Sequence, residues 1–183
     1  MITTLDCETT FVVEDNKKTN PMPWVGNQLV SVGYHAEFPA GATDEYLCFY
    51  HIEEPPTDGA TASLKTTLSH TTLLICHNVK FDLTWLRECG FVYDGCTYDT
   101  MLAEYVIARS RKKSFKLGDC LRRRGLSPKR SDLTQEYLAD GVGFDKMPWS
   151  VVEEYGRADV ASTLELAQAQ LEELGMEFED FIT

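Results

Sequence analysis

The sequence predicts one α/β domain in which a mixed β-sheet is flanked by helices. Near the N-terminus, strand-like segments are separated by short turns that contain Pro or Gly, which is typical of an antiparallel meander. After residue 70 the chain instead alternates between a short apolar strand and helical segments. Strands first and alternating helices later indicate a mixed sheet with helices on its faces. The 183 residues are enough for one such domain with a sizeable core.

The strands are expected where Val, Leu, Tyr and Phe gather between turn residues. Three of them form the meander: Ile2 to Glu8, Gln28 to His35 and Glu45 to His51. A fourth strand, Thr72 to Cys76, is short and apolar enough to be buried. The residues themselves therefore predict four strands.

A helix is expected directly after the fourth strand, from Val79 to Cys89, and Gly90 is a suitable residue to end it. Another helix is expected from Thr100 to Ala108, followed by helical pieces within residues 109–130 and an irregular stretch over 131–147.

The last and longest helix is expected from Trp149 to Leu174. Its leucines form an apolar stripe, and Gly175 is a suitable C-cap. Gly156 is a candidate break within it.

Composition excludes several classes of protein. With 43% hydrophobic and 11% aromatic residues, the chain is not expected to be disordered. No apolar run is long enough to cross a bilayer and no secretory signal is evident, so we expect a cytoplasmic protein without a membrane partner. The six cysteines form no C-x-x-C pair, and we expect them to be reduced, buried thiols rather than disulfides or zinc ligands.

Charge is distributed unevenly along the chain, whose net charge is -12. Between Arg109 and Arg130, ten basic residues are opposed only by Asp119, which gives this segment a charge of +9. A basic patch on an acidic body can orient a polyanion. The alternative is a solvated helix face that balances the acidic remainder.

Asp6 and Glu8 stand two residues apart on the first predicted strand. Because side chains alternate along a strand, both carboxylates project from the same face. Two like charges so placed are unfavourable unless a cation lies between them, and hard divalent cations prefer oxygen ligands. The alternative is a solvated strand end.

Further polar residues lie on predicted helices. Asp82 is one turn into the helix after the fourth strand, with Asn78 before it and Phe81 beside it. It either stabilises the helix N-terminus or belongs to a ligand site at a strand-to-helix junction. Tyr155 and Asp159 are four residues apart and share one face of the last helix. A packed aromatic residue is the alternative for the tyrosine.

Three motifs occur in order along the chain: Leu5-Asp6-Cys7-Glu8-Thr9-Thr10, His77-Asn78-Val79-Lys80-Phe81-Asp82-Leu83 and Tyr155-Gly156-Arg157-Ala158-Asp159. Together they resemble the exonuclease motifs of the DnaQ-like (DEDD) 3′–5′ exonuclease superfamily, in its tyrosine subclass, and in particular the proofreading domain of family A (polymerase I-like) DNA polymerases. The segment Tyr98-Asp99-Thr100-Met101-Leu102-Ala103 reinforces the resemblance, which covers residues 2 to about 174. It implies a ribonuclease H-like fold with a mixed five-stranded sheet flanked by helices.

The resemblance also implies an activity: hydrolysis of the 3′-terminal phosphodiester of single-stranded or frayed DNA, with release of nucleoside 5′-monophosphates. Two divalent cations, Mg²⁺ or Mn²⁺, would be held by four carboxylates, those of Asp6, Glu8, Asp82 and Asp159. Tyr155 would orient the attacking water. By the same resemblance, substrate contacts are expected from Thr9, Phe11, Val12, Asn78 and Phe81. The basic segment, Arg122, Arg123 and Arg124 in particular, would guide the phosphate backbone.

Two other functions stay open: an exoribonuclease of the same superfamily, and a non-catalytic module that binds nucleic acid or a polymerase. The chain ends soon after the last predicted helix, so we expect a stand-alone exonuclease, a subunit beside a separate DNA polymerase or replisome component, or an excised domain. Such compact modules are frequent in bacteriophages, which would place the protein in a host cytoplasm. Residues 1–175 are expected to form the exonuclease domain, and the acidic and aromatic tail, 176–183, either docks a partner or packs as a chain end.

Overall fold

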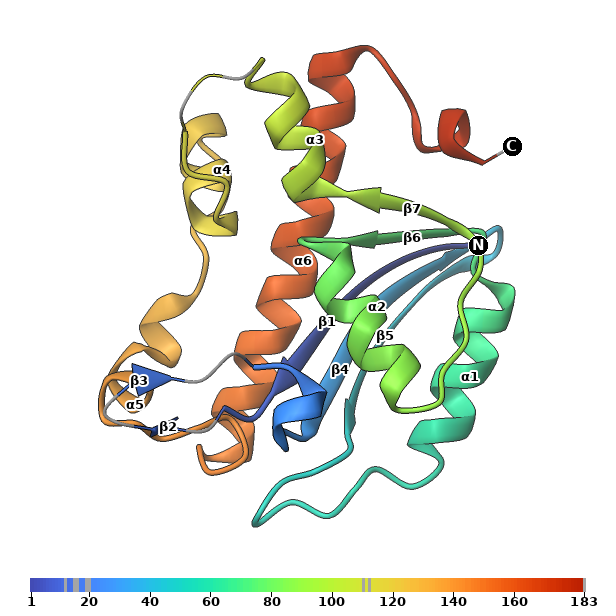
Figure 1. The fold of residues 1–183 in the computed structure, drawn as a ribbon. Coiled ribbons are helices and arrows are strands. Elements are labelled where there is room, and N and C mark those ends of the chain that lie inside the picture. The colour runs from blue at the N-terminus through green and yellow to red at the C-terminus, as the bar shows by residue number, and fades with distance from the viewer. Residues whose placement is uncertain (12, 15–16, 19–20, 110, 112, 183) are drawn as a thin grey trace.

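The computed structural model describes residues 1–11, 13–14, 17–18, 21–109, 111 and 113–182. Its centre is a five-stranded sheet with the strand order β5-β4-β1-β6-β7 (Figure 1). The antiparallel half contains β1 (Ile2–Thr9), β4 (Leu29–Phe38) and β5 (Gly41–Cys48). On the other side of β1, β6 (Leu73–Cys76) and β7 (Cys96–Asp99) run parallel to it.

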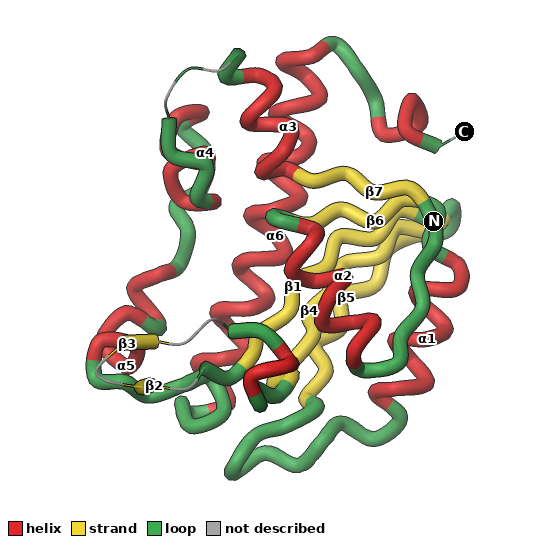
Figure 2. The backbone as a smooth tube through the Cα atoms, viewed as in Figure 1, coloured by secondary structure: helices red, strands yellow, loops and turns green. Residues whose placement is uncertain are grey.

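Helices cover both faces of the sheet (Figure 1). One face carries α1 (Ala60–His70) and α2 (Val79–Glu88), and α6 (Trp149–Leu174) crosses the other. Beside α6 lie α3 (Thr100–Ile107), α4 (Leu117–Arg124) and α5 (Gln135–Ala139). The minor elements are β2 (Val13–Glu14), β3 (Lys17–Lys18) and the 3-10 turns Pro23–Val25, Ser131–Leu133 and Phe178–Phe181. Figure 2 shows the long loop that joins β5 to α1.

Two hydrophobic cores fix which way the β1 side chains point. One core lies between the sheet and helices α1 and α2, and the other lies between the sheet and α6. Leu5 and Cys7 belong to the first core. Because side chains alternate along a strand, Asp6 and Glu8 project from the opposite face, toward α6.

The observed architecture agrees with the predicted class, a mixed five-stranded sheet flanked by helices. Two elements of the main fold, β7 and α1, were not predicted from the residues, and neither were the shorter elements β2, β3 and α5. The predicted break at Gly156 is wrong, because α6 is one continuous helix. A Cβ at Gly156 would collide with the ring of Tyr46, so this glycine allows the helix to approach the sheet closely.

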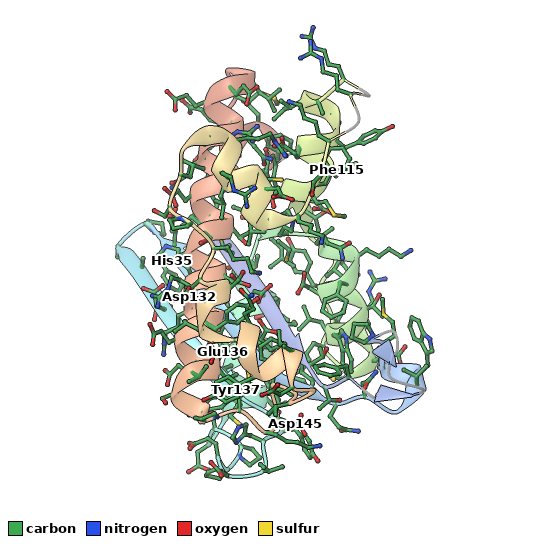
Figure 3. All side chains as sticks on the ribbon, turned by 90° about the vertical axis from the view of Figure 1, so that its left-hand side faces the viewer. His35, Phe115, Asp132, Glu136, Tyr137 and Asp145 are labelled. Atoms are coloured by element: carbon green, nitrogen blue, oxygen red, sulfur yellow. The ribbon has the colours of Figure 1, made fainter. Side chains whose placement is uncertain are left out.

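The segment expected to be irregular, 131–147, contains α5 and packs beside the first turns of α6. Figure 3 shows Asp132, Glu136, Tyr137 and Asp145 along the lower half of that helix. Tyr137 joins a small core with the buried residues Val152 and Met147.

The C-terminal tail packs against β7 through its aromatic residues. The Phe181 and Phe178 rings meet the Tyr98 ring edge-on, with centroid distances of 5.1 Å and 6.4 Å. The exposed side chains of the tail include acidic Glu177 and Glu179. All six cysteines are free thiols. Four of them are buried as expected, whereas Cys96 is half-buried and Cys89 is exposed. No helix among the described residues is long and apolar enough to cross a membrane.

Candidate active site

Three of the four predicted carboxylates form one cluster. One oxygen each of Asp6, Glu8 and Asp159 lies within 4.8 Å of the others. The first two come from β1 and the third from α6, which crosses the face of the sheet toward which β1 directs them. Asp159 and Glu8 are buried, with 3% and 9% of their surfaces exposed.

Asp82 approaches the cluster from the other side of β1. It lies in the first turn of α2 and is 1% exposed. Its Oδ1 accepts a hydrogen bond of 3.1 Å from the Cys7 backbone N–H, which ties α2 to the strand between Asp6 and Glu8. The structure therefore places Asp82 next to the cluster but outside the set of three closely spaced carboxylates.

Burial and mutual repulsion make the ionised cluster unfavourable. Burial raises the pKa of Asp6 to about 7, and Asp159 adds to the rise while Lys129 opposes it. Burial likewise raises the pKa of Glu8, Asp82 and Asp159 above their ordinary values. A cation among these groups would offset the repulsion and restore the ionised forms.

The donor set fits hard divalent cations. Oxygen ligands from several carboxylates are what Mg²⁺ and Mn²⁺ prefer. Asp159 Oδ1 is buried and has no hydrogen-bond partner among the described residues, so one ligand atom is left for a cation. The site residues thus fit the metal that the exonuclease resemblance implies.

Lys129 is a site residue that the sequence did not single out. Its Nζ lies 2.5 Å from Asp159 Oδ2, and its ammonium lies 5.1 Å from the centroid of the Tyr155 ring. The lysine follows α4 and reaches the cluster from a segment 30 residues before Asp159. Only its place in the net basic segment, Arg109 to Arg130, pointed to it.

Tyr155 lies one helical turn before Asp159 and is 8% exposed. Its ring stacks on Phe144 with a centroid distance of 5.6 Å and an interplanar angle of 27°. Burial raises the pKa of the phenol well above its ordinary value, and the carboxylates of Glu8 and Asp159 raise it further. The hydroxyl therefore stays protonated at neutral pH and can orient a group by hydrogen bonding.

Asn78 occupies a strained backbone position at the start of α2. Its backbone φ of 73° lies in the left-handed region, which residues other than glycine adopt infrequently. Asp99 supports this turn, since its carboxylate accepts bonds from the backbone N–H groups of Asn78 and Val79 at 2.9 Å and 3.2 Å. The same carboxylate caps α3 through Met101 N–H at 2.9 Å.

A small cavity borders Glu8 on one side of the cluster. It has a volume of about 290 Å³, and its walls include Thr9, Phe11, Phe81 and Phe144. Three predicted substrate contacts are thus brought together in one mostly apolar pocket. Val12, the remaining contact predicted at this end, lies outside the described residues.

A larger groove, of about 740 Å³, lies on the side of Lys129. Its walls come from the start of α2, from α3 and from α4, and they include Asn78, Met101, Lys116, Arg122 and Lys129. Figure 3 places Phe115, another residue of its wall, near α3 and α4. His77 fixes this wall, since its Nε2 lies 3.0 Å from the Phe115 carbonyl oxygen.

The three predicted arginines of α4 have different surroundings. Arg122 is on the wall of the groove, and its side chain is 79% exposed. In contrast, Arg123 and Arg124 form ion pairs of 2.9 Å and 2.6 Å with the buried carboxylate of Glu104 on α3. These two arginines therefore fasten α4 to α3, a structural role that the sequence did not indicate.

The fold and the site define the class of the protein: an α/β protein with a ribonuclease H-like exonuclease fold and an acidic cluster at its sheet. A family profile described as 3′–5′ exonuclease, of the DNA polymerase A type, matches residues 31–174. The chain belongs to this family of 3′–5′ exonuclease domains. The matched residues do not include Asp6 and Glu8. Their place in the site comes from the structure, which brings them close to Asp159.

Solved structures are similar at low sequence identity. A protein described as the apo form of the nuclease has a TM-score of 0.58 and 16% identity, over 95% of this chain and 74% of its own, and this likeness concerns the fold alone. The POL domain of Pol1 from M. smegmatis, in complex with DNA primer-template and dNTP, has a TM-score of 0.49 and 20% identity, over 81% of this chain and 22% of its own. A search of curated proteins finds no match.

Proposed function

We propose that the protein is a metal-dependent 3′–5′ exodeoxyribonuclease. It would hydrolyse the 3′-terminal phosphodiester of single-stranded or frayed DNA and release nucleoside 5′-monophosphates, in replication proofreading or DNA degradation. The observation that carries this proposal is the carboxylate cluster, with an apolar pocket at Glu8 and a groove at Lys129, in a chain of the 3′–5′ exonuclease family.

The four acidic residues would hold two divalent cations, Mg²⁺ or Mn²⁺. When bound, such ions activate a water on one side of a phosphate and stabilise the leaving oxygen on the other. Asp6 and Glu8 would face the ions from β1 and Asp159 from α6, and Asp82 would act from α2 through water. The buried and unpartnered Oδ1 of Asp159 supports a ligand role for that residue.

Tyr155 would hold the attacking water by a hydrogen bond from its hydroxyl. Since the pKa of this phenol is raised, the group is a poor base at neutral pH and positioning is its better role. Its packing between Phe144 and Lys129 would keep the ring fixed during the reaction.

The two cavities suggest a path for the substrate. The apolar pocket beside Glu8 suits the terminal base, with Phe11 and Phe81 as its aromatic walls. The groove lined by Lys116 and Arg122 suits the preceding nucleotides, since a basic groove with aromatic side chains is a common way to bind a single strand. A duplex end would have to fray to enter both, and a mismatched end frays more readily.

Digestion of a 5′-labelled single-stranded DNA tests the proposal. We expect a ladder that shortens from the 3′ end with Mg²⁺ or Mn²⁺ and disappears with EDTA or in the Asp6→Ala variant. Lys65→Ala, on α1 across the sheet, serves as the matched control and should keep full activity. A folded, metal-supplied protein that leaves the DNA intact would contradict the proposal.

The same assay separates the other candidates. Preferential shortening of an RNA of the same sequence would favour an exoribonuclease, because both polymers use the same metal chemistry and differ at the 2′-hydroxyl. Binding of DNA without cleavage would favour a non-catalytic module. Co-purification with a DNA polymerase that is lost on deletion of 176–183 would support docking by the tail.

A further inference from the structure

The acidic cluster already contains one positive charge of its own. The Lys129 ammonium forms an ion pair of 2.5 Å with Asp159 Oδ2, and the two side chains are only 24% and 5% exposed. The other salt bridge with a nearly buried carboxylate among the described residues is that of Glu104, which lies in the structural contact between α3 and α4. Lys129 instead lines the groove that leads to the cluster.

The surroundings of Lys129 keep this charge in place. The ammonium pairs directly with Asp159, one oxygen of which lies within 4.8 Å of oxygens of Asp6 and Glu8. The Tyr155 ring contributes a cation–π contact at 5.1 Å. Because the carboxylates of Asp6, Glu8 and Asp159 are so close together, the charge of Lys129 acts on more than one of them.

We propose that Lys129 is a resident monovalent cation of the carboxylate cluster, which occupies one oxygen of Asp159 and lowers the affinity of the cluster for divalent ions. This inference rests on the proposed metal-dependent function. Asp159 divides its two oxygens: Oδ2 binds the ammonium, and Oδ1 is buried without a partner among the described residues. A divalent ion on Oδ1 would lie close to the like charge of Lys129, in a site where burial weakens screening.

The ammonium has a second effect in the same direction. When all four carboxylates around the site are ionised, as ligands of divalent ions, they carry four negative charges, and Lys129 offsets one of them. Each divalent ion therefore meets a weaker field than the carboxylates alone would produce. The protein would consequently respond to changes in the free concentration of divalent cation instead of retaining the ions at all concentrations.

Calorimetric titration of Mn²⁺ into the 183-residue chain, without nucleic acid, tests this inference. Lys129→Met keeps the length and apolar stem of the side chain and removes its charge. We expect its Mn²⁺ dissociation constant to fall at least about tenfold, which corresponds to about 1.4 kcal/mol. Lys129→Arg, which keeps the charge, should bind Mn²⁺ as the wild type does.

Lys116→Met is the matched control. Lys116 lines the same groove but forms no salt bridge among the described residues, so its loss should leave Mn²⁺ affinity unchanged. If Lys129→Met does not fold, as judged by circular dichroism, Lys129→Gln replaces it, with the same tightening expected.

The outcomes distinguish this inference from the proposed function. If the wild type binds Mn²⁺ and a folded, uncharged Lys129 variant binds it with equal or lower affinity, the inference is overturned but the proposed function is not. A Lys129→Arg variant that binds as tightly as Lys129→Met would overturn it as well. Wild-type protein that binds no Mn²⁺ at all would overturn both.

Discussion

Without divalent cations, the protein should become less stable as the pH rises from about 4 to about 8. The folded-state pKa of Asp6 is about 7, against an ordinary value of 3.8. The folded protein therefore holds this proton more tightly than the unfolded chain does. The stabilisation is fully present below the ordinary pKa and is lost as the pH rises through the folded-state value.

The size of this effect follows from the same shift. A pKa change of about 3 units at 1.36 kcal/mol per unit gives a loss of about 4 kcal/mol, as an upper limit for Asp6. The steepest slope that one such group can produce is about 1.4 kcal/mol per pH unit. Divalent ions should reverse the trend, because they compete with the protons and bind the ionised carboxylates.

Urea unfolding in EDTA, followed by tryptophan fluorescence, which includes the signal of buried Trp85, measures the free energy of unfolding at each pH. The wild type should lose stability between about pH 4 and about pH 8, a range that contains both the ordinary and the folded-state pKa of Asp6, and Asp6→Asn should lose clearly less. Addition of Mn²⁺ at about pH 8 should restore the stability of the wild type but not that of Asp6→Asn. If both proteins show equal slopes, or if the wild type gains stability with pH in EDTA, the carboxyl of Asp6 does not control the pH dependence.

Three further predictions concern single side chains. Tyr155→Phe should lower kcat by about 10²-fold with little change in KM, since only the water-orienting hydroxyl is lost; a change confined to KM in steady-state assays would contradict this role. Glu104→Ala should lower the free energy of unfolding by about 3 to 5 kcal/mol in urea titrations, because it leaves Arg123 and Arg124 without their buried partner; a loss under about 1 kcal/mol would mean that the pair is not structural. Arg122→Glu should weaken single-strand binding and reduce the slope of log affinity against log salt by about 0.7, whereas Lys65→Glu, on α1, should leave both unchanged. An unchanged salt slope for Arg122→Glu would remove this residue from the binding groove.

The sequence predicted the parts of the molecule that local pattern controls. Alternation along β1 was enough to place Asp6 and Glu8 on one face, and helical spacing was enough to place Tyr155 next to Asp159. Only the fold brings these two pairs together, because α6 lies across β1.

Long-range contacts explain what the sequence did not reveal. Lys129 and Asp159 are 30 residues apart in the sequence, and Arg124 and Glu104 are 20 apart. Neither pair therefore produces a pattern among neighbouring residues that a sequence analysis could detect. For the same reason, three neighbouring arginines in one basic segment could not be divided into one exposed residue and two structural ones. Replacing all three by Glu would disrupt the contact between α3 and α4, so the single Arg122 variant is the cleaner test of DNA binding.

Weak local signals explain the elements that were not predicted. The strand β7 has only four residues and includes the polar residues Thr97 and Asp99. The helix α1 is rich in Thr and Ser, which favour helices little, and it is held by the burial of Ala60, Leu64 and Leu68. In both cases packing against the sheet decides the structure.

We propose that this site cuts the 3′-terminal phosphodiester bond between phosphorus and the 3′ oxygen of the preceding nucleotide. The most direct measurement uses an oligonucleotide with a fluorescent base at its 3′-terminal nucleotide, digested with Mg²⁺ under single-turnover conditions. Chromatography should show the fluorescent nucleoside 5′-monophosphate as the first product, and Asp6→Ala should release none. Release of the label as a free nucleoside, within a longer fragment, or at the same rate from Asp6→Ala would contradict the proposed activity.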